Sequence, residues 1–316
     1  MRDRKRMLAY AEEYLTYRRK LGFKLEIEGR QTLHFARYVD AIGHRGPLTT
    51  DLALEWARLP ENVTRLYQAR RLEVVRCFAK YMSIFDPRTQ IPADRLLGIA
   101  HRRIQPYIYS LAEISRLLRA ARALAPVGGL RPRTYATLIG LLASTGLRTK
   151  EALRLPRDDV DFNEGILTIR ETKFHKSRLV PMDATVTRAM RKYARFRDSY
   201  VPIQGSTTFL LGENGRRLGS STVYWTFRRL CATCGIRSAS GSRAPRLYDM
   251  RHTFACRRLL RWHQEGFDVE QAIPALSTFL GHVKVTDTYW YLSGIPELFS
   301  VVGAKFERYA RQDQGG

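Results

Sequence analysis

Four side chains suited to phosphate chemistry stand in distinctive short phrases in the second half of the sequence. Arg148 follows a glycine in TGLRTKE and Arg251 lies in RLYDMRHTFA, whereas His282 and Tyr291 stand nine residues apart in LGHVKVTDTYWYLSG. An arginine stays ionised at any working pH, and its planar fork can hold two oxygens of a phosphate. A tyrosine oxygen can attack phosphorus and store the energy of a phosphodiester bond as a phosphotyrosine ester. Any one of these residues alone would more often be structural than catalytic.

Together with a lysine-bearing segment between them, these phrases resemble the catalytic set of the tyrosine recombinases, the family of phage integrases, Xer-type resolvases and Cre. The motifs cover residues 106–300, in the family's order Arg, Lys, Arg, His, Tyr. The resemblance implies a site-specific DNA recombinase or integrase of a bacterial mobile element, which cleaves and rejoins strands through a 3′-phosphotyrosine intermediate. It also implies a reaction without metal, ATP or any other cofactor.

The resemblance assigns a role to each residue. Arg148 and Arg251 are the two catalytic arginines, which neutralise charge on the nonbridging oxygens of the phosphate. Glu151 takes the place of the acidic residue that supports the first arginine. His282 hydrogen-bonds a nonbridging oxygen, and Tyr291 is the nucleophile.

Two of these assignments have rivals. In TKFHKSRLVPM, alignment with the family on RLVPM indicates Lys173 as the residue that lends a proton to the departing 5′ oxygen. Lys176 is the competitor, because a flexible hairpin tip can bring either ammonium to the site. Tyr289 is a second phenol close to Tyr291, and we expect it to pack inside the protein.

One position departs from the family pattern. The family usually has His-x-x-Arg before the second arginine, but here Tyr248 stands three residues before Arg251. His252 is not expected to replace the missing imidazole, because a one-residue helical step turns a side chain by about 100°. A tyrosine can donate a hydrogen bond to a phosphoryl oxygen, yet with a reference pKa of about 10 it is a poor proton shuttle near neutrality. A catalytically weak or silent DNA-binding partner of another recombinase is therefore the alternative function.

The elements that must position these residues are mostly helical. Apolar side chains recur at helical spacing in the first hundred residues, for example at Phe35 and Val39, and Thr64 is placed to cap a helix. Between Asp159 and Met182, the β-branched runs ILTIR and SRLVPM predict a hairpin with a basic tip, and TTFLLG predicts a further short strand. The expected fold class is mainly α with a small antiparallel β-sheet.

A domain boundary is expected at residues 100–108, where prolines, a basic cluster and a loss of periodicity coincide. Residues 1–103 should form a helical DNA-clamp domain that resembles the family's SAM-like core-binding domain in size, charge and helicity. Residues 104–316 should form the tyrosine recombinase catalytic domain. Its end, from Pro296, has the pattern of a tail helix. In this family such a helix often docks on a neighbouring protomer, and docking on its own domain is the alternative.

The net charge of +24, from 54 Lys and Arg against 30 Asp and Glu, predicts a polyanionic partner. Residues 1–105 carry +9 of this excess and the remainder +15, as expected for two surfaces that face double-stranded DNA. On composition alone, a nucleic-acid-binding or ribosome-associated protein without chemistry of its own is the leading interpretation. The basic residues that could contact DNA, or form a solvated face instead, are Arg65, Arg70, Arg71, Arg76 and Lys80 on one predicted helix and Lys176 on the hairpin tip.

Several other classes are disfavoured. The sequence has no P-loop and no HExxH, and Cys231 and Cys234 in CATCG lack a second ligand pair, so no metal site is expected. The four cysteines fit a reducing cytosol, and no apolar run approaches the ~18 residues of a membrane span. We expect a cytoplasmic, nucleoid-associated protein, and the resemblance implies a homo- or hetero-tetramer assembled on two DNA sites. A metal-dependent nuclease and a topoisomerase-like relaxer of supercoils are competing functions.

Overall fold

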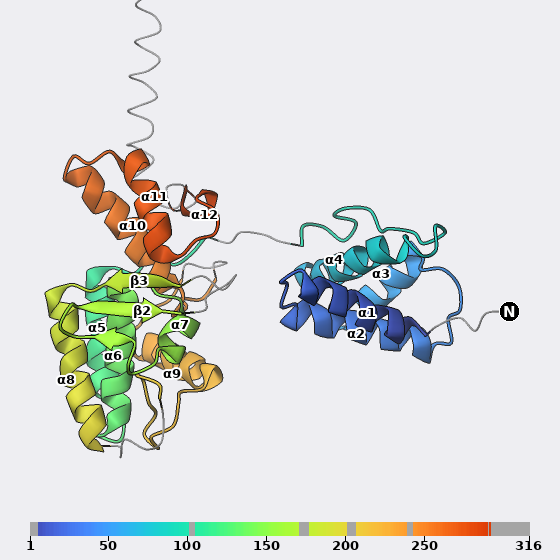
Figure 1. Ribbon diagram of the computed structural model, residues 1–316. Helices are drawn as coiled ribbons and strands as arrows, with labels where there is room; N and C mark the ends of the chain where they lie inside the picture. Colours follow the sequence, from blue (N-terminus) through green and yellow to red (C-terminus); the bar gives the residue numbers. More distant parts are fainter. Residues whose placement is uncertain are drawn as a thin grey trace, which may run out of the picture. The chain divides into compact units, whose positions relative to one another are not determined.

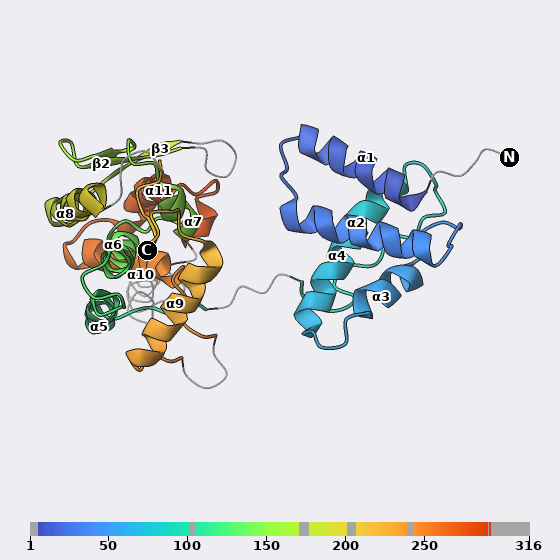
Figure 2. The same cartoon turned by 90° about the horizontal axis from the view of Figure 1, so that it is seen from below.

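The computed structural model of the chain describes residues 6–100, 105–170, 177–200, 207–238, 243–289 and 291. The chain forms two compact units, Met1–Arg103 and Ile104–Gly316, and each has its own hydrophobic core (Figures 1 and 2). Within the described ranges, no helix combines the length and the apolar character that crossing a bilayer requires.

The described part of the N-terminal unit is helical. Its helices are α1 (Met7–Lys20), α2 (Glu26–Ala41), α3 (Thr50–Arg58) and α4 (Arg65–Met82). Phe35, Trp56 and Phe78 are fully buried where α2, α3 and α4 meet, and the ring of Phe35 packs edge-on against the other two. Thr64 accepts a hydrogen bond from the backbone N–H of Tyr67, so its predicted capping role is confirmed.

The C-terminal unit is built around one buried helix, α6 (Leu130–Thr145). This helix packs against α5 (Leu111–Arg122), α8 (Ala184–Tyr200) and α10 (Asp249–Gln264) (Figure 1). Neighbours on several sides explain why α6 is apolar around most of its circumference. The short helix α7 (Thr149–Arg154) follows α6 directly, and α9 (Ser220–Thr233) packs against α5. The turn between α6 and α7 contains Arg148, so the core of the unit fixes the position of that residue.

A small antiparallel sheet accompanies these helices. Its strands, in spatial order, are β1 (Val160–Asp161), β2 (Ile166–Ile169) and β3 (Arg178–Pro181). The pairing of β2 with β3, which ends with Ile169 opposite Arg178, confirms the predicted hairpin and the predicted fold class. The tip of the hairpin, residues 171–176, lies outside the described residues. The strand predicted at TTFLLG is wrong, because Thr208 and Leu211 make only isolated bridges.

The last described helices enclose a second, smaller hydrophobic cluster. Side chains of α10, including Phe254, and of α11 (Val269–Leu280) form this cluster together with the ring of Tyr291, which follows α12 (Thr286–Tyr289). Phe279 packs against this cluster and against the larger one around α6. The end of α11 therefore stands at the seam between two hydrophobic clusters. The tail helix predicted after Pro296 lies outside the described residues.

Gly146 closes α6 at this seam. Its φ of +61° is in the left-handed region, where glycine is favoured. A methyl group on Gly146 would lie 2.6 Å from Phe254 and 2.9 Å from Leu280. Backbone conformation and space therefore both exclude a side chain here.

We predict that Gly146→Ala lowers the free energy of unfolding by more than Gly235→Ala does. The two glycines have φ values of +61° and +66°, so each substitution carries a conformational cost of about 1–2 kcal/mol. A methyl on Gly235 meets nothing within 4 Å, whereas one on Gly146 overpacks the seam and adds roughly 1–3 kcal/mol. Urea unfolding followed by tryptophan fluorescence measures the difference. Equal losses would contradict the close packing of α6 on α10 and α11.

Candidate active site

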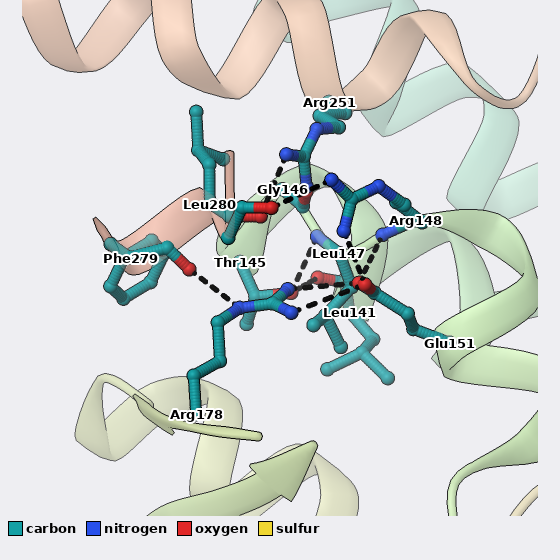
Figure 3. A network of polar contacts seen from close by, with 11 residues as sticks. Leu141, Thr145, Gly146, Leu147, Arg148, Glu151, Arg178, Arg251, Phe279 and Leu280 are labelled. Carbon is teal, nitrogen blue, oxygen red and sulfur yellow. Dashed lines mark hydrogen bonds and ion pairs between the residues drawn. The ribbon is translucent and has the colours of Figure 1, made fainter. Parts of the chain in front are cut away.

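The carbonyl oxygens of residues 279–281, at the C-terminal end of α11, accept hydrogen bonds from three arginines (Figure 3). Arg178 donates through Nε to the first at 2.9 Å, Arg251 through Nη2 to the second at 2.7 Å, and Arg148 through Nη2 to the third at 2.8 Å. The last carbonyls of a helix have no partner within the helix and carry partial negative charge. Three positive side chains from distant parts of the sequence therefore converge on one helix end.

Glu151, in the first turn of α7, is held by two of these arginines. Arg178 donates to both carboxylate oxygens, at 3.1 and 2.8 Å, and Arg148 donates from Nη1 at 2.7 Å and from its backbone N–H at 2.9 Å. Burial disfavours the charged carboxylate, but the hydrogen bonds and charges of Arg178 and Arg148 outweigh it and keep the pKa of Glu151 below its ordinary value. In the described part of this network, two guanidinium groups therefore share one carboxylate, and the nearby Arg251 donates to carbonyls instead. The excess positive charge suits an anion.

Arg251, in the first turn of α10, joins the ends of two other helices. Besides its bond to α11, it donates through Nη1 to the carbonyl oxygen of Gly146 at 2.8 Å. The residue is only 1% exposed, and this burial, to which the charge of Arg148 adds, lowers the pKa of Arg251. An arginine nevertheless stays protonated in proteins. The buried guanidinium of Arg251 thus lies within the electrostatic influence of the partly exposed Arg148.

His282 and Tyr291 complete the cluster. Their rings are stacked, with centroids 5.8 Å apart, and Nδ1 of His282 lies 2.7 Å from the hydroxyl oxygen of Thr288. Burial and the charges of Arg251 and Arg148 lower the pKa of His282 to about 4, so the imidazole is neutral near pH 7. Tyr291 is 3% exposed, and burial raises its pKa to about 12 against the charge and hydrogen bonding of Arg251. Tyr291 is therefore a neutral phenol beside Arg251 in the same chain.

His252 also reaches the site, so the expectation that its helical step turns it away is wrong. Its ring centroid lies 5.4 Å from that of Tyr291 and 5.3 Å from that of Tyr248, edge-on in both cases. Residues four apart on a helix are neighbours, which brings His252 beside Tyr248. Burial and the charges of Arg246 and Arg251 lower the pKa of His252 to about 3. Tyr248 is 38% exposed and borders the site, whereas His252 is buried between the two phenols.

The sequence from residue 110 to residue 294 matches the Phage integrase family. This range is more than half of the chain, and it contains all the residues of the cluster. The chain belongs to the phage integrase family. The resemblance to tyrosine recombinases that the motifs indicated is confirmed.

Relatives and a solved structure agree with membership of the phage integrase family. A protein of Sinorhizobium fredii (strain NBRC 101917 / NGR234) that carries the designation integrase/recombinase y4rB is 44% identical over 302 residues, which are 94% of this chain and 96% of that protein. Tyrosine recombinase XerD of Rhizobium meliloti (strain 1021) is 31% identical over 73% of this chain and 70% of its own. The structure of the Tn1549 transposon integrase in complex with transposon right end DNA is similar with a TM-score of 0.68 and 18% identity, and covers 97% of this chain and 100% of that one. This last likeness shows the tyrosine recombinase fold.

The described residues of the family's motif meet around the end of α11. The structure brings together Arg148, Glu151, Arg251, His282 and Tyr291, as the resemblance implies. Their proximity is an observation, and their catalytic roles stay predictions.

The rival residues have different outcomes. Lys173 and Lys176 lie in the segment 171–176, outside the described residues. Tyr289 is 46% exposed, so the prediction that it packs inside the protein is wrong. The short helix α12 leaves the ring of Tyr289 accessible, whereas the ring of Tyr291, two residues later, enters the smaller hydrophobic cluster.

The prediction that Arg71 contacts DNA is wrong, because its side chain is buried. Its guanidinium lies over the indole ring of Trp56, with Cζ 3.6 Å from the ring centroid, and Nη2 donates to the carbonyl oxygen of Trp56 at 2.7 Å. The side chain is buried in the core of the N-terminal unit. A cation placed on an aromatic face and hydrogen-bonded to the backbone can be buried at low cost.

The other basic residues of α4 fall into two groups. Arg70 and Arg76 donate to backbone carbonyls of the 92–100 segment, at 3.0 and 2.9 Å, and so attach that segment to the helix. Arg65 and Lys80 are exposed and make no such bond among the described contacts, and Arg70 is exposed as well. Contact with DNA stays a prediction for Arg65, Arg70, Arg76 and Lys80.

Arg178 is the member of the cluster that the sequence did not single out. Side chains alternate along a strand, so Arg178 shares a face of β3 with the buried Val180 and not with the exposed Leu179. The sequence did contain one signal for Arg178, because a charged residue at a core-facing position of a predicted strand requires a polar partner. Its partners could not be inferred, because they lie on α7 and α11.

The cysteine pair belongs to the hydrophobic core. Cys231 is buried in the larger cluster, and Cys234 packs against that cluster. Burial raises the pKa of Cys231 to about 12, so its thiol is protonated near pH 7. In the part of the chain that the structure describes, no group of three or more His, Cys, Asp and Glu side chains is arranged to hold a metal ion.

We predict that the free energy of unfolding falls as the pH is lowered from about 6.5 to about 4. The pKa values of His252 and His282, about 3 and about 4, lie below the unfolded value of about 6.5, so in this window the unfolded chain binds protons that the folded chain does not. Each histidine contributes a slope of up to about 1.4 kcal/mol per pH unit. Urea unfolding at several pH values should show a shallower slope for His252→Gln/His282→Gln than for the wild type. The exposed His263→Gln is the control, and an unchanged slope in the double variant would contradict the neutral, buried state of both imidazoles.

Proposed function

We propose that this member of the phage integrase family is a site-specific recombinase whose nucleophile is Tyr291. The observation that carries the proposal is the phenol of Tyr291 beside Arg251 and His282, in a buried cluster with an excess of positive charge. In the proposed step, the tyrosine oxygen bonds to phosphorus, the bond from phosphorus to the 5′ oxygen breaks, and the 5′ oxygen gains a proton. The products are a 3′-phosphotyrosine and a free 5′ hydroxyl, and attack by a 5′ hydroxyl reverses the step.

The arginine pair supplies the countercharge in this proposal. Phosphoryl transfer places negative charge on the nonbridging oxygens. Each guanidinium has five N–H donors, and the bonds of Arg148 and Arg251 to carbonyls and to Glu151 leave further donors on each for those oxygens. Because the phosphotyrosine stores the bond energy and the arginines neutralise the charge, we propose that the reaction needs neither metal nor ATP.

Proton transfer is divided among the remaining groups. Tyr291, with a pKa of about 12, releases its proton to water only as its oxygen attacks phosphorus, and the group that protonates the 5′ oxygen regains a proton from water. His282 is neutral and can hydrogen-bond a nonbridging oxygen. We assign the proton of the departing 5′ oxygen to Lys173, with Lys176 as the alternative donor. Since Arg251 and Tyr291 are almost fully buried, a DNA phosphate reaches them only when neighbouring side chains move.

The proposed partner is double-stranded DNA. A net charge of +24, spread over both units, suits a polyanion that both contact. Exchange of strands between two duplexes requires four cleavages, so we propose an assembly of four protomers on two sites, on bacterial DNA in the cytoplasm. The similarity to a transposon integrase supports a role in a mobile element.

A second function is favoured by one specific observation. Tyr248 stands where the family usually has histidine, and the buried His252 beside it has a pKa of about 3, which makes it a weak base. This arrangement supports a DNA-binding partner that contributes little catalysis of its own. The covalent product decides between the two functions.

We predict that the wild type forms an SDS-resistant protein–DNA adduct on a nicked suicide substrate and that Tyr291→Phe binds the same DNA without forming it. The phenylalanine keeps the ring in its cluster and removes only the attacking oxygen. Tyr289→Phe is the matched control and should retain the adduct, which chelator should not abolish. Peptide mapping identifies the linked residue. An adduct on Tyr289 would assign the nucleophile to that residue instead. Absence of an adduct would support the catalytically silent DNA-binding partner. Cleavage that a chelator abolishes and that leaves no protein on the DNA would indicate a metal-dependent nuclease.

We also predict that DNA affinity falls linearly with salt on a log–log plot, with a slope of about −0.9 for each neutralised phosphate. Fluorescence anisotropy of labelled duplex measures this slope. Lys80→Gln should reduce its magnitude by about 1 if the exposed ammonium contacts a phosphate, and Arg65→Gln likewise. A flat profile for the wild type would contradict a clamp that binds through phosphate contacts.

A further inference from the structure

We infer that Arg178 is a positioning residue for strand cleavage, which fixes the carboxylate of Glu151 and through it the guanidinium of Arg148. The inference rests on the proposed function, because the orientation of Arg148 affects catalysis only if that residue binds the scissile phosphate. Arg178 lies on β3, in the phrase TKFHKSRLVPM, but it is none of the residues to which the resemblance assigns a role.

The contact between Arg178 and Glu151 defines the orientation of the carboxylate. Arg178 binds both oxygens through its two terminal nitrogens, in the parallel geometry that gives arginine–carboxylate pairs their directionality. The same oxygens accept the side-chain and backbone N–H groups of Arg148. The carboxylate of Glu151 thus lies between two guanidinium groups (Figure 3). Arg178 fixes its orientation, and the carboxylate in turn fixes the orientation of Arg148.

A third hydrogen bond ties Arg178 to the helix end that the other arginines use. Its Nε donates to Phe279, directly before the carbonyls that bind Arg251 and Arg148. Five donors in a fixed fork can serve α7 and α11 at once, whereas a lysine is a point charge and cannot. Arg178 therefore links β3 to α7 and to α11, and its hydrogen bonds fix the relative positions of these three elements.

Gly281 provides a separate indication that this space is built for Arg178. Its φ of +70° is left-handed, and a methyl on Gly281 would lie 2.8 Å from Nη1 and 3.0 Å from Cζ of Arg178. The glycine of the LGH phrase is thus required by the close approach of this guanidinium as well as by its own backbone. The side chain of Arg178 is 9% exposed, and its described bonds lead to protein groups, so it acts through Glu151.

Removal of Arg178 should change the pH dependence of cleavage. The charged groups around Glu151 are Arg148 directly before α7, Arg178 on β3 and Arg251 on α10. His282, which follows α11, interacts with the same three arginines and with Asp287. Without Arg178, the burial of Glu151 is no longer outweighed by its strongest partner, and the pKa of Glu151 rises. As the pH falls through that raised pKa, the carboxylate gains a proton and releases Arg148.

The test uses the full chain in single-turnover cleavage of the suicide substrate, from pH 7.5 to pH 5. We expect Arg178→Gln to slow formation of the phosphotyrosine about 10- to 100-fold with an unchanged Kd for DNA, since small displacements of a binding group can cost about that much. The loss should deepen as the pH falls. In the double variant Glu151→Gln/Arg178→Gln, this extra decrease in rate at low pH should disappear. At pH 7.5, the fold-decrease in cleavage rate of the double variant should be smaller than the product of the fold-decreases of the two single variants, because both residues act through one contact.

Arg170→Gln is the matched control. Arg170 directly follows β2, the other strand of the same hairpin, and forms an ion pair with Asp159 at 2.9 Å, which is not part of the network around α11. The Arg170→Gln variant should cleave the suicide substrate at the wild-type rate. Arg178→Lys keeps the charge without the fork and should restore only part of the activity.

The outcomes separate the inference from the proposed function. If the wild type forms the Tyr291 adduct and Arg178→Gln cleaves at the wild-type rate and pH profile, the inference is overturned and the proposed function stands. If the wild type forms no adduct, both fall. Thermal melts accompany each variant, and if Arg178→Gln does not fold, a wild-type rate in Arg178→Lys overturns the inference instead.

Discussion

The carbonyl groups at the C-terminal end of α11 are the reference point of the candidate site. A helix end leaves these oxygens without partners and with partial negative charge. Here they are matched by arginines from the start of α7, from β3 and from α10, which are far apart in the sequence. A buried guanidinium is tolerable only when it is hydrogen-bonded, so each arginine depends on α11 being docked. The geometry of the charged groups is therefore a consequence of how one helix ends.

The same cluster of positive charge sets the protonation of its neighbours. Arg251 and Arg148 help to keep His282 neutral, and Arg251 opposes the effect of burial on the phenol of Tyr291. Glu151 compensates part of this charge and is itself kept ionised by it. Residues that look independent in the sequence are thus coupled through one local electric field, which a bound phosphate would largely neutralise.

The sequence predicted the features that depend on local spacing. Thr64 as a helix cap, the β2–β3 hairpin and the grouping of Arg148 with Arg251 and His282 rest on short phrases with recognisable periods or motifs. The residues that were misplaced or not singled out depend on long-range contacts. Arg71 is buried because Trp56 offers an aromatic face, and Arg178 joins the hydrogen-bond network because Glu151 and α11 lie opposite β3. Neither partner can be identified from spacing along one segment.

The division of the C-terminal unit into two hydrophobic clusters has a thermal consequence. Tyr291 belongs to the smaller cluster, whereas buried side chains of α6 such as Leu138 and Leu142 belong to the larger one. Arg251 spans the boundary through its bonds to Gly146 and Leu280. Proteins open in cooperative subunits of unequal stability. Detachment of the smaller cluster would separate Tyr291 from Arg148 while most of the fold persisted, so warming would take the candidate site apart reversibly, well before bulk denaturation.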